Sequence, residues 1–235
     1  MPQSLLIGVI LVLAWSGILM AVMQYAAVVK MPHKRIREPR ANKITLKTKI
    51  VNVIGNMSVA LAMIFSALIV FGDYLISSES VAWYWVIVEA IIALMVYDFM
   101  YYFFHRAMHH PKAMKYCHGV HHYIRHPTAF ESIYVHPFEG IGGVFLMLLG
   151  VAIVGPISIA SFVLALFIYN SCNILVHANI TWDSKLMGLA NYWARRHDIH
   201  HGVHLNRNYA SIFPFWDKMF GTYASVLGIS PRHKS

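Results

Sequence analysis

Charged residues are scarce in this chain, and their scarcity excludes most soluble folds. Of 235 residues, 58% are hydrophobic and only 12% are charged, whereas an average soluble domain has about a quarter of its residues charged. The same composition excludes intrinsic disorder and a coiled coil. Two cysteines, Cys117 and Cys172, are too few for a disulfide framework, and nothing indicates an oxidising compartment. The composition therefore favours a membrane protein.

Lysine and arginine are absent from four long apolar blocks, residues 1–29, 50–72, 81–104 and 140–177. Each of the first three matches the roughly 20 helical residues that cross a bilayer core. The first lacks the basic start of a signal peptide, so we expect it to be a membrane helix. The fourth block has 38 residues and contains Gly155-Pro156, where a helix would break. We expect a hairpin there, with helices near 140–154 and 157–177, the first either crossing the bilayer or dipping into it.

The distribution of basic residues predicts how these helices are oriented. Eight of the 19 lysines and arginines lie in 30–49, four in 105–139 and seven in 178–235. Five crossings with the N-terminus outside place all three segments on the cytoplasmic face, as the positive-inside rule requires. The net charge of +9 is then explained by topology and anionic lipid, and we expect no nucleic-acid partner. The sequence predicts an all-α, multi-pass membrane bundle with a cytoplasmic, histidine-rich helical cap, located in a bacterial inner membrane or the endoplasmic reticulum.

Histidine, in contrast, is abundant, with fifteen copies against ten acidic residues. His105-Arg-Ala-Met-His109 is an i, i+4 pair, and His118-Gly-Val-His121-His122 and His197-Asp-Ile-His200-His201 are trios at i, i+3 and i+4. If helical, each trio lies on one face and aims its three rings at one point, where they would bind a metal. A lone histidine is usually a solvated side chain, but these repeated spacings make coincidence a poor explanation. About ten imidazoles are enough for two metals with open positions.

The order of these boxes resembles the fatty acid hydroxylase/sterol desaturase superfamily, whose members are membrane-bound, non-haem di-iron enzymes that use dioxygen on lipids. Three further segments are similar to motifs of that family: Tyr134-Val-His136-Pro-Phe-Glu139, Asn208-Tyr209-Ala and Phe215-Trp216-Asp217-Lys-Met-Phe220-Gly221-Thr-Tyr223. The resemblance implies a catalytic domain over residues 50–223, after an N-terminal helix and basic loop at 1–49 and before a tail at 224–235.

The resemblance also implies a set of metal ligands, namely His105, His109, His118, His121, His122, His136, His177, His197, His200 and His201. Some members have a His-x-x-x-His third box, where this chain reads Asn173-Ile-Leu-Val-His177. Either Asn173 contributes through an oxygen or a bridging water, or His136 takes that place. The family pattern does not require His204, which we expect to be a supporting or surface residue.

Carboxylates near the boxes are candidates for orienting the ligands. Asp98 lies seven residues before His105, on the same helical stripe, and either accepts the N–H of a metal-bound histidine or extends to the interface. Asp98 and Asn173 are our two candidate catalytic residues. Glu139 and Asp198 are weaker candidates for the same orienting role, and the sequence suggests no role for Glu89.

The resemblance implies that two iron ions activate dioxygen and hydroxylate, or desaturate, a C–H bond of a lipid such as a sterol or fatty acyl chain. Zinc is expected in some purified samples, because it binds imidazole more tightly than ferrous iron does. No cytochrome or flavin domain accompanies the boxes, so we expect a separate electron donor, a b-type cytochrome or a ferredoxin with its reductase. The alternative is a metal transporter or metal-binding protein, but a transporter would place its ligands near the bilayer midplane.

Overall fold

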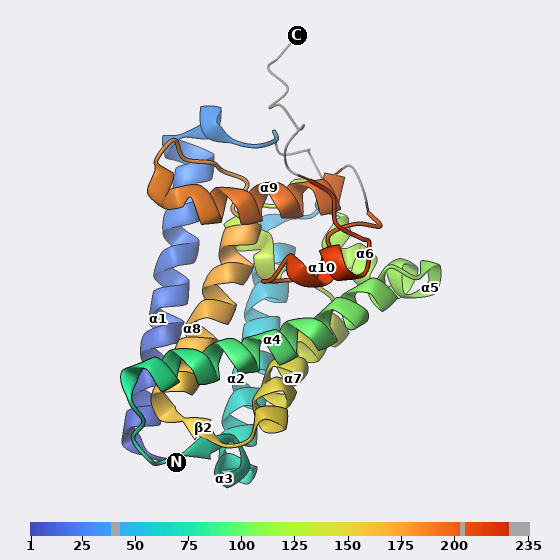
Figure 1. Cartoon of the computed structure of the whole chain (residues 1–235). Helices are drawn as coiled ribbons and strands as arrows, with labels where there is room; N and C mark the ends of the chain where they lie inside the picture. Colours follow the sequence, from blue (N-terminus) through green and yellow to red (C-terminus); the bar gives the residue numbers. More distant parts are fainter. Residues whose placement is uncertain (39–42, 203–204, 226–235) are drawn as a thin grey trace.

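Five long helices dominate the computed structural model, which describes residues 1–38, 43–202 and 205–225 (Figure 1). They are α1 (Gln3–Tyr25), α2 (Leu46–Val70), α4 (Trp83–Met108), α7 (Pro137–Val154) and α8 (Ile159–Val176). All five are long and apolar enough to cross a membrane, and α1 continues through the π-helical turn η1 (Ala26–Lys30). The predicted all-α membrane bundle is confirmed, and α7 and α8 form the expected hairpin.

Short segments connect the long helices. At one end of the bundle lie α3 (Gly72–Leu75), β1 (Ile76–Ser77) and β2 (Ile157–Ser158). The other end carries the cap, which comprises η2 (Pro32–Lys34), α5 (Pro111–Ala113), η3 (Met114–His118), α6 (Gly119–His122), η4 (Ala129–Ile133), η5 (Lys185–Met187), α9 (Gly188–Gly202) and α10 (Phe215–Met219). Because the helices alternate in direction, the described parts of all three basic segments meet at the cap end (Figure 1).

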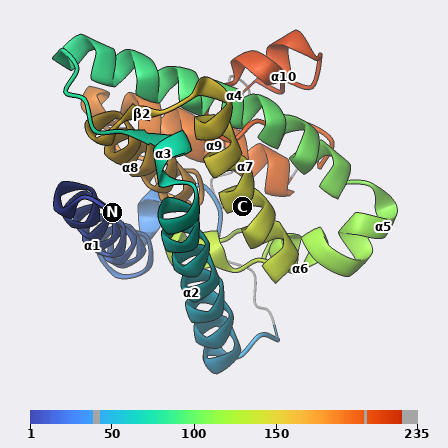
Figure 2. The same cartoon turned by 90° about the horizontal axis from the view of Figure 1, so that it is seen from below.

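The packing order explains the shape of the bundle. Helix α4 runs obliquely across the others and packs on α7 and α8, while α1 packs on α8 and α2 on α7 (Figures 1 and 2). Where α7 meets α4, a Cβ added to Gly150 would lie 3.0 Å from the carbonyl oxygen of Ala93. Small residues of this kind let membrane helices approach closely, because packing rather than the hydrophobic effect drives their association. Helix α9 lies across the end of α8 and closes the bundle (Figure 1).

The hairpin turn shows how the sequence ends one helix and starts the next. Gly155 has φ +101°, a left-handed conformation that glycine adopts without strain, and α7 ends just before it. Ile157 then pairs in parallel with Ile76, joining the two short strands. Glu89 of α4 accepts hydrogen bonds from the Ser158 N–H (2.9 Å) and the Ser161 hydroxyl (2.6 Å). Glu89, to which the sequence assigned no role, therefore caps α8.

Candidate metal centre

Among the residues that the structure describes, nine histidine side chains meet at the cap end of the bundle, in two groups. The five-histidine group contains His105, His109, His118, His122 and His200. The four-histidine group contains His121, His177, His197 and His201. In each group one nitrogen per residue lies within 4.8 Å of the others, so nine of the ten expected ligands are brought together.

In the five-histidine group, His118 is central. Its Nε2 lies 3.2 Å from that of His105, 3.0 Å from that of His109 and 2.9 Å from that of His122. The His200 Nε2 lies 3.2 Å from that of His109. Two nitrogens bound at right angles to a metal at about 2.1 Å are about 3 Å apart. One shared proton cannot serve the three neighbours of His118, whereas a metal ion can, so this group fits a metal.

The four-histidine group has the same geometry. The His121 Nε2 lies 3.1 Å from those of His177 and His201, and the His177 Nε2 lies 2.9 Å from that of His197. These spacings again match neighbouring positions around a metal ion. His177 comes directly after α8 and the other three belong to α6 and α9, so this group joins the membrane hairpin to the cap.

The two His-x-x-His-His boxes interlock. In the box at 118–122 the outer histidines belong to the five-histidine group and His121 belongs to the other; in the box at 197–201, only His200 belongs to the five-histidine group. The expectation that each trio aims its three rings at one point is therefore wrong. Residues i and i+4 are about 40° apart around a helix, whereas i+3 points about 60° to the other side. Each helix thus contributes ligands at two points.

A π-helical turn positions the box at 118–122. The turn η3 ends at His118, and α6 begins at the next residue, Gly119. A Cβ at Gly119 would collide with the carbonyl oxygen of Met114, so only glycine fits directly after His118. Single π-helical turns are frequent at functional sites.

Backbone carbonyls hold several of these rings from behind. The Nδ1 atoms of four histidines lie within hydrogen-bond distance of a carbonyl oxygen, namely His105 with Tyr209 (2.7 Å), His200 with Arg207 (2.7 Å), His177 with Asn173 (2.7 Å) and His121 with Tyr134 (3.3 Å). An Nδ1–H that donates to a carbonyl leaves the Nε2 lone pair free for a metal and fixes the ring orientation. The anchors therefore favour the tautomer that metal binding requires.

Burial keeps these imidazoles neutral. It lowers the pKa of His109 and of His121 to about 4, and that of His177 to about 3. Burial and the neighbouring histidines hold the pKa of His118 well below its usual value. Neutral imidazole is the form that binds metals, so the site is in its binding form at neutral pH.

The tenth expected ligand, His136, lies outside both groups in the described parts of the chain. Its Nδ1 accepts the N–H of Phe138 at 3.2 Å and so caps the start of α7. The expectation that His136 replaces the missing third-box histidine is therefore corrected, because its ring is engaged at the helix end. Asn173 does lie at the site, where its backbone carbonyl accepts from His177 and the residue lines a cavity beside the histidines.

Asp98 does not pair with a histidine. Its fully buried carboxylate accepts the backbone N–H groups of Ser211, Ile212 and Phe213, at 2.7, 3.0 and 2.7 Å. Both alternatives suggested by the sequence are thus wrong. Seven residues of helix span about 10 Å, too far for contact with His105, and the nearer partner is a loop distant in sequence.

The two weaker carboxylate candidates have different partners. A carboxylate oxygen of Glu139 lies 2.9 Å from the Nδ1 of His118, which makes it the carboxylate behind the central histidine. Asp198 instead forms an ion pair with Arg37 at 2.9 Å. Burial raises the pKa of Asp198, and the Arg37 guanidinium opposes that rise. His204 lies outside the described residues, so its dispensability stays a prediction.

A cavity inside the bundle adjoins the histidines. It measures about 190 Å³ and is lined by residues of α1, α2, α4, α7 and α8. A smaller cavity beside it is lined by His105, His121, His177 and His197. Six residues line both, namely Tyr101, Ser132, Val135, Glu139, Asn173 and Ser211. The larger cavity thus adjoins the imidazoles at these six residues.

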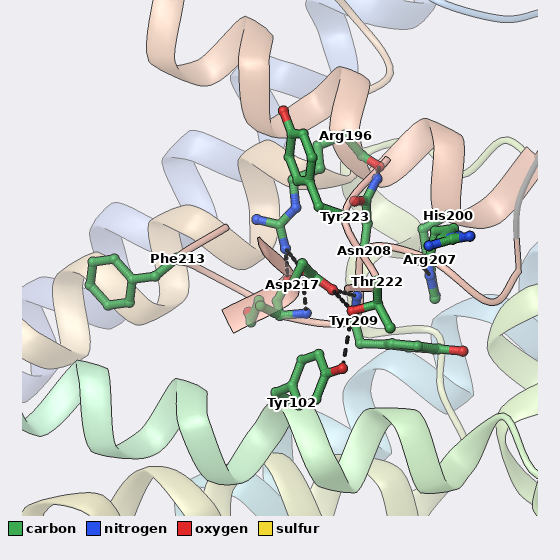
Figure 3. Close-up of polar contacts among 12 residues, drawn as sticks. Tyr102, Arg196, His200, Arg207, Asn208, Tyr209, Phe213, Asp217, Thr222 and Tyr223 are labelled. Carbon is green, nitrogen blue, oxygen red and sulfur yellow. Dashed lines mark hydrogen bonds and ion pairs between the residues drawn. The ribbon is translucent and has the colours of Figure 1, made fainter. Parts of the chain in front are cut away.

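Sequence reasoning missed the function of a buried network beneath α9. Asp217 lies between Arg196, which approaches within 3.1 Å, and Thr222, whose hydroxyl donates to it at 2.8 Å (Figure 3). The Tyr102 hydroxyl contacts that of Thr222 at 3.0 Å. Asp217 stood within a quoted motif, but two of the four partners of its carboxylate are backbone N–H groups, which no side-chain pattern reveals.

The fold and the two histidine groups together define a histidine-box protein of the membrane whose clusters suit metal ions. The model of the fatty acid hydroxylase family matches residues 90–222, more than half of the chain, and the chain belongs to this family. The predicted resemblance is thereby confirmed. The predicted domain limits at 50 and 223 enclose the matched range and stay a prediction.

Individual relatives agree with this family. Methylsterol monooxygenase 1 of Gallus gallus is 29% identical over 163 residues, which are 66% of this chain and 53% of that protein. Methylsterol monooxygenase 1 of Rattus norvegicus is 32% identical over 148 residues, 60% of this chain and 48% of that protein. The very-long-chain aldehyde decarbonylase GL1-11 of Oryza sativa subsp. japonica is 30% identical over 153 residues, 60% and 54% of the two chains. The chain spans about half the length of these relatives, and no solved structure matches it significantly.

Proposed function

We propose that this protein is a membrane-bound di-iron oxygenase that uses dioxygen to hydroxylate, or desaturate, a C–H bond of a lipid. The observation that carries this proposal is the cavity between the membrane helices, which adjoins a cavity lined by histidines of both groups. Leu13, Leu61 and Met147 are among the apolar residues that line it away from the histidines. A lipid chain entering from the bilayer would place one of its carbons beside the imidazoles.

Each histidine group holds one iron ion in this proposal. Bound iron supplies the redox chemistry that activates dioxygen, for which nitrogen ligands are suitable. Carbonyl anchors hold four of the nine neutral imidazoles in place, and a carboxylate oxygen of Glu139 lies 2.9 Å from the Nδ1 of a fifth, His118. Because the histidines gather at one end of the bundle, the arrangement supports an enzyme rather than a transporter, whose ligands would lie at the midplane.

Polar residues at the junction of the two cavities would orient the lipid. Tyr101, Asn173 and Ser211 line both cavities beside the histidines. They would bind a hydroxyl or carbonyl group near the reacting carbon, while the apolar lining excludes water from the rest of the molecule. The names of two relatives favour a sterol substrate, and that of a third favours a long aliphatic chain.

The site faces the cytoplasm in this proposal, because the basic segments lie at the same end of the bundle. Electrons would come from a separate protein, a b-type cytochrome or a ferredoxin with its reductase, that docks at this face.

Lipid mass spectrometry tests the proposal. Membranes from cells with the gene should contain a lipid that is heavier by one oxygen, or lighter by two hydrogens, than its precursor in cells without the gene. Cells that express His121→Ala at equal level are the matched control and should show only the precursor. An identical lipid profile in all three strains, with the iron-loaded protein present, would overturn the proposal.

A further inference from the structure

Two buried carboxylates bind five successive backbone N–H groups of one loop. Asp217 accepts from Tyr209 at 2.7 Å and from Ala210 at 3.1 Å. Asp98 accepts from the next three residues, 211–213, at 2.7–3.0 Å. Both carboxylates have 0% exposure. A buried charge is costly unless it is fully hydrogen-bonded, so this loop and these two side chains must be ordered together.

Neighbouring groups fix the loop further. Arg196 of α9 donates to the Ala210 carbonyl and to the Asp217 carboxylate (Figure 3). It thereby connects the loop to the helix that carries the box at 197–201. Asn208 has φ +59°, a left-handed conformation that asparagine tolerates, and its side chain donates to the Arg196 carbonyl at 3.1 Å. The loop at 207–213 is therefore held on both sides.

The same loop anchors two metal-site histidines, both in the five-histidine group. The Arg207 carbonyl lies 2.7 Å from the His200 Nδ1, and the Tyr209 carbonyl lies 2.7 Å from the His105 Nδ1. The carbonyl anchors of the four-histidine group are those of Tyr134 and Asn173, which lie elsewhere. Support from the loop is thus selective for one group.

We propose that Asp98 and Asp217 are positioning residues that hold the five-histidine group ready for its metal by fixing the loop at 207–213. The inference rests on that part of the proposed function which places a metal in this group, and it does not depend on the lipid reaction. Residues behind metal ligands commonly change metal affinity about 10- to 100-fold. The five-histidine group should therefore lose affinity by about this factor when either carboxylate is altered, and the four-histidine group should not.

The test measures iron bound per full-length chain in detergent for Asp98→Asn and Asp217→Asn. Glu89→Gln is the matched control, because Glu89 is also a carboxylate of α4 that accepts a backbone N–H, but at the far end of the helix. At an iron concentration that just saturates the wild type, we expect two irons per chain in the wild type and the control, and one in each Asn variant. Mössbauer spectra should show that one iron environment is lost and the other is unchanged. Adding His121→Ala to either Asn variant should remove the remaining iron.

Two results would overturn the inference: Asn variants that keep both irons with unchanged affinity, or folded Asn variants that lose both irons equally. If neither Asn variant folds, Thr222→Val decides, because it removes only one hydrogen-bond donor from Asp217. We expect it to weaken only the five-histidine group, and unchanged affinity would again contradict the inference. A chain that shows selective iron loss but oxidises no lipid would overturn the proposed function alone.

Discussion

The membrane bundle and the cap are built on different principles. In the candidate spans only 22–39% of the residues in the most apolar window are buried inside the protein, so much of their surface faces the surroundings. In the cap, by contrast, many polar groups are buried and have specific partners, as Asp217 and His200 do. The bundle can thus be read from composition, whereas the cap depends on specific contacts between distant residues. We infer that the bundle determines which lipid enters the cavity and that the cap determines the metal chemistry.

The largest effect is expected from removing a histidine of the cap. His121→Ala or His200→Ala should abolish lipid oxidation and lower the iron content, because each removes a group directed at a metal position. Membrane insertion should persist, since the five spans do not include the cap. Activity, iron content and membrane fractionation measure the three outcomes. His110→Ala, an exposed histidine beside the site, is the control, and unchanged turnover in His121→Ala would contradict the separation of roles.

A substitution in the bundle should impair the binding of the lipid substrate and leave the metals in place. Gly17 lines the larger cavity, and an added Cβ there would meet no atom within 4 Å. Gly17→Phe should therefore fill the cavity and lower lipid turnover about tenfold or more, with iron content unchanged. Gly55→Phe is the matched control, because Gly55 also has free space but does not line the cavity. Equal turnover in the two variants would show that the lipid does not use this cavity.

Labelling from each side of the membrane tests which side each end of the bundle faces. Cysteines introduced at Ser78 and at Ser184 lie at opposite ends of the bundle, both on exposed residues. A membrane-impermeant thiol reagent should reach Ser184→Cys only from the cytoplasmic side and Ser78→Cys only from the other. Labelling of both from the same side would refute the five-crossing topology.

Acid should destabilise the folded cap of the metal-free protein, and this is the smallest of the expected effects. In the unfolded chain histidine takes up a proton near pH 6.5, whereas burial lowers the pKa of folded His121 to about 4. Between these values the unfolded state binds more protons, so stability is complete above about pH 6.5 and falls as the pH drops towards 4. Thermal unfolding of the metal-free protein over this range measures the effect. A flat profile would mean that the histidines are not buried in the folded state.

The bundle was largely predictable because its signals are local. Blocks without lysine or arginine located the spans, and Gly155-Pro156 located the hairpin turn. Helix ends shifted by a few residues, since caps such as Ser158 act through contacts with the backbone. The histidine spacing singled out eight of the nine residues that come together, and the family resemblance added His177.

The division of each box between two groups could not be predicted, because it depends on α6 and α9 facing each other across the site. The partners of Asp98 were equally hidden, being backbone N–H groups more than 110 positions along the chain. His136 misled because a ring nitrogen that caps a helix and one that binds a metal look alike in a sequence. Tertiary contacts, rather than residue types, decided each of these cases.

Metal counting in paired variants tests the interlocked centre most directly. His118→Ala/His122→Ala removes two residues of the five-histidine group, and His197→Ala/His201→Ala removes two of the four-histidine group. After iron reconstitution we expect one iron per chain in each double variant, against two in the wild type. Adding His121→Ala should remove the last iron from the first variant and cause no further loss from the second. If His121→Ala causes no further loss from the first variant, each box forms its own site and the interlocked arrangement is wrong.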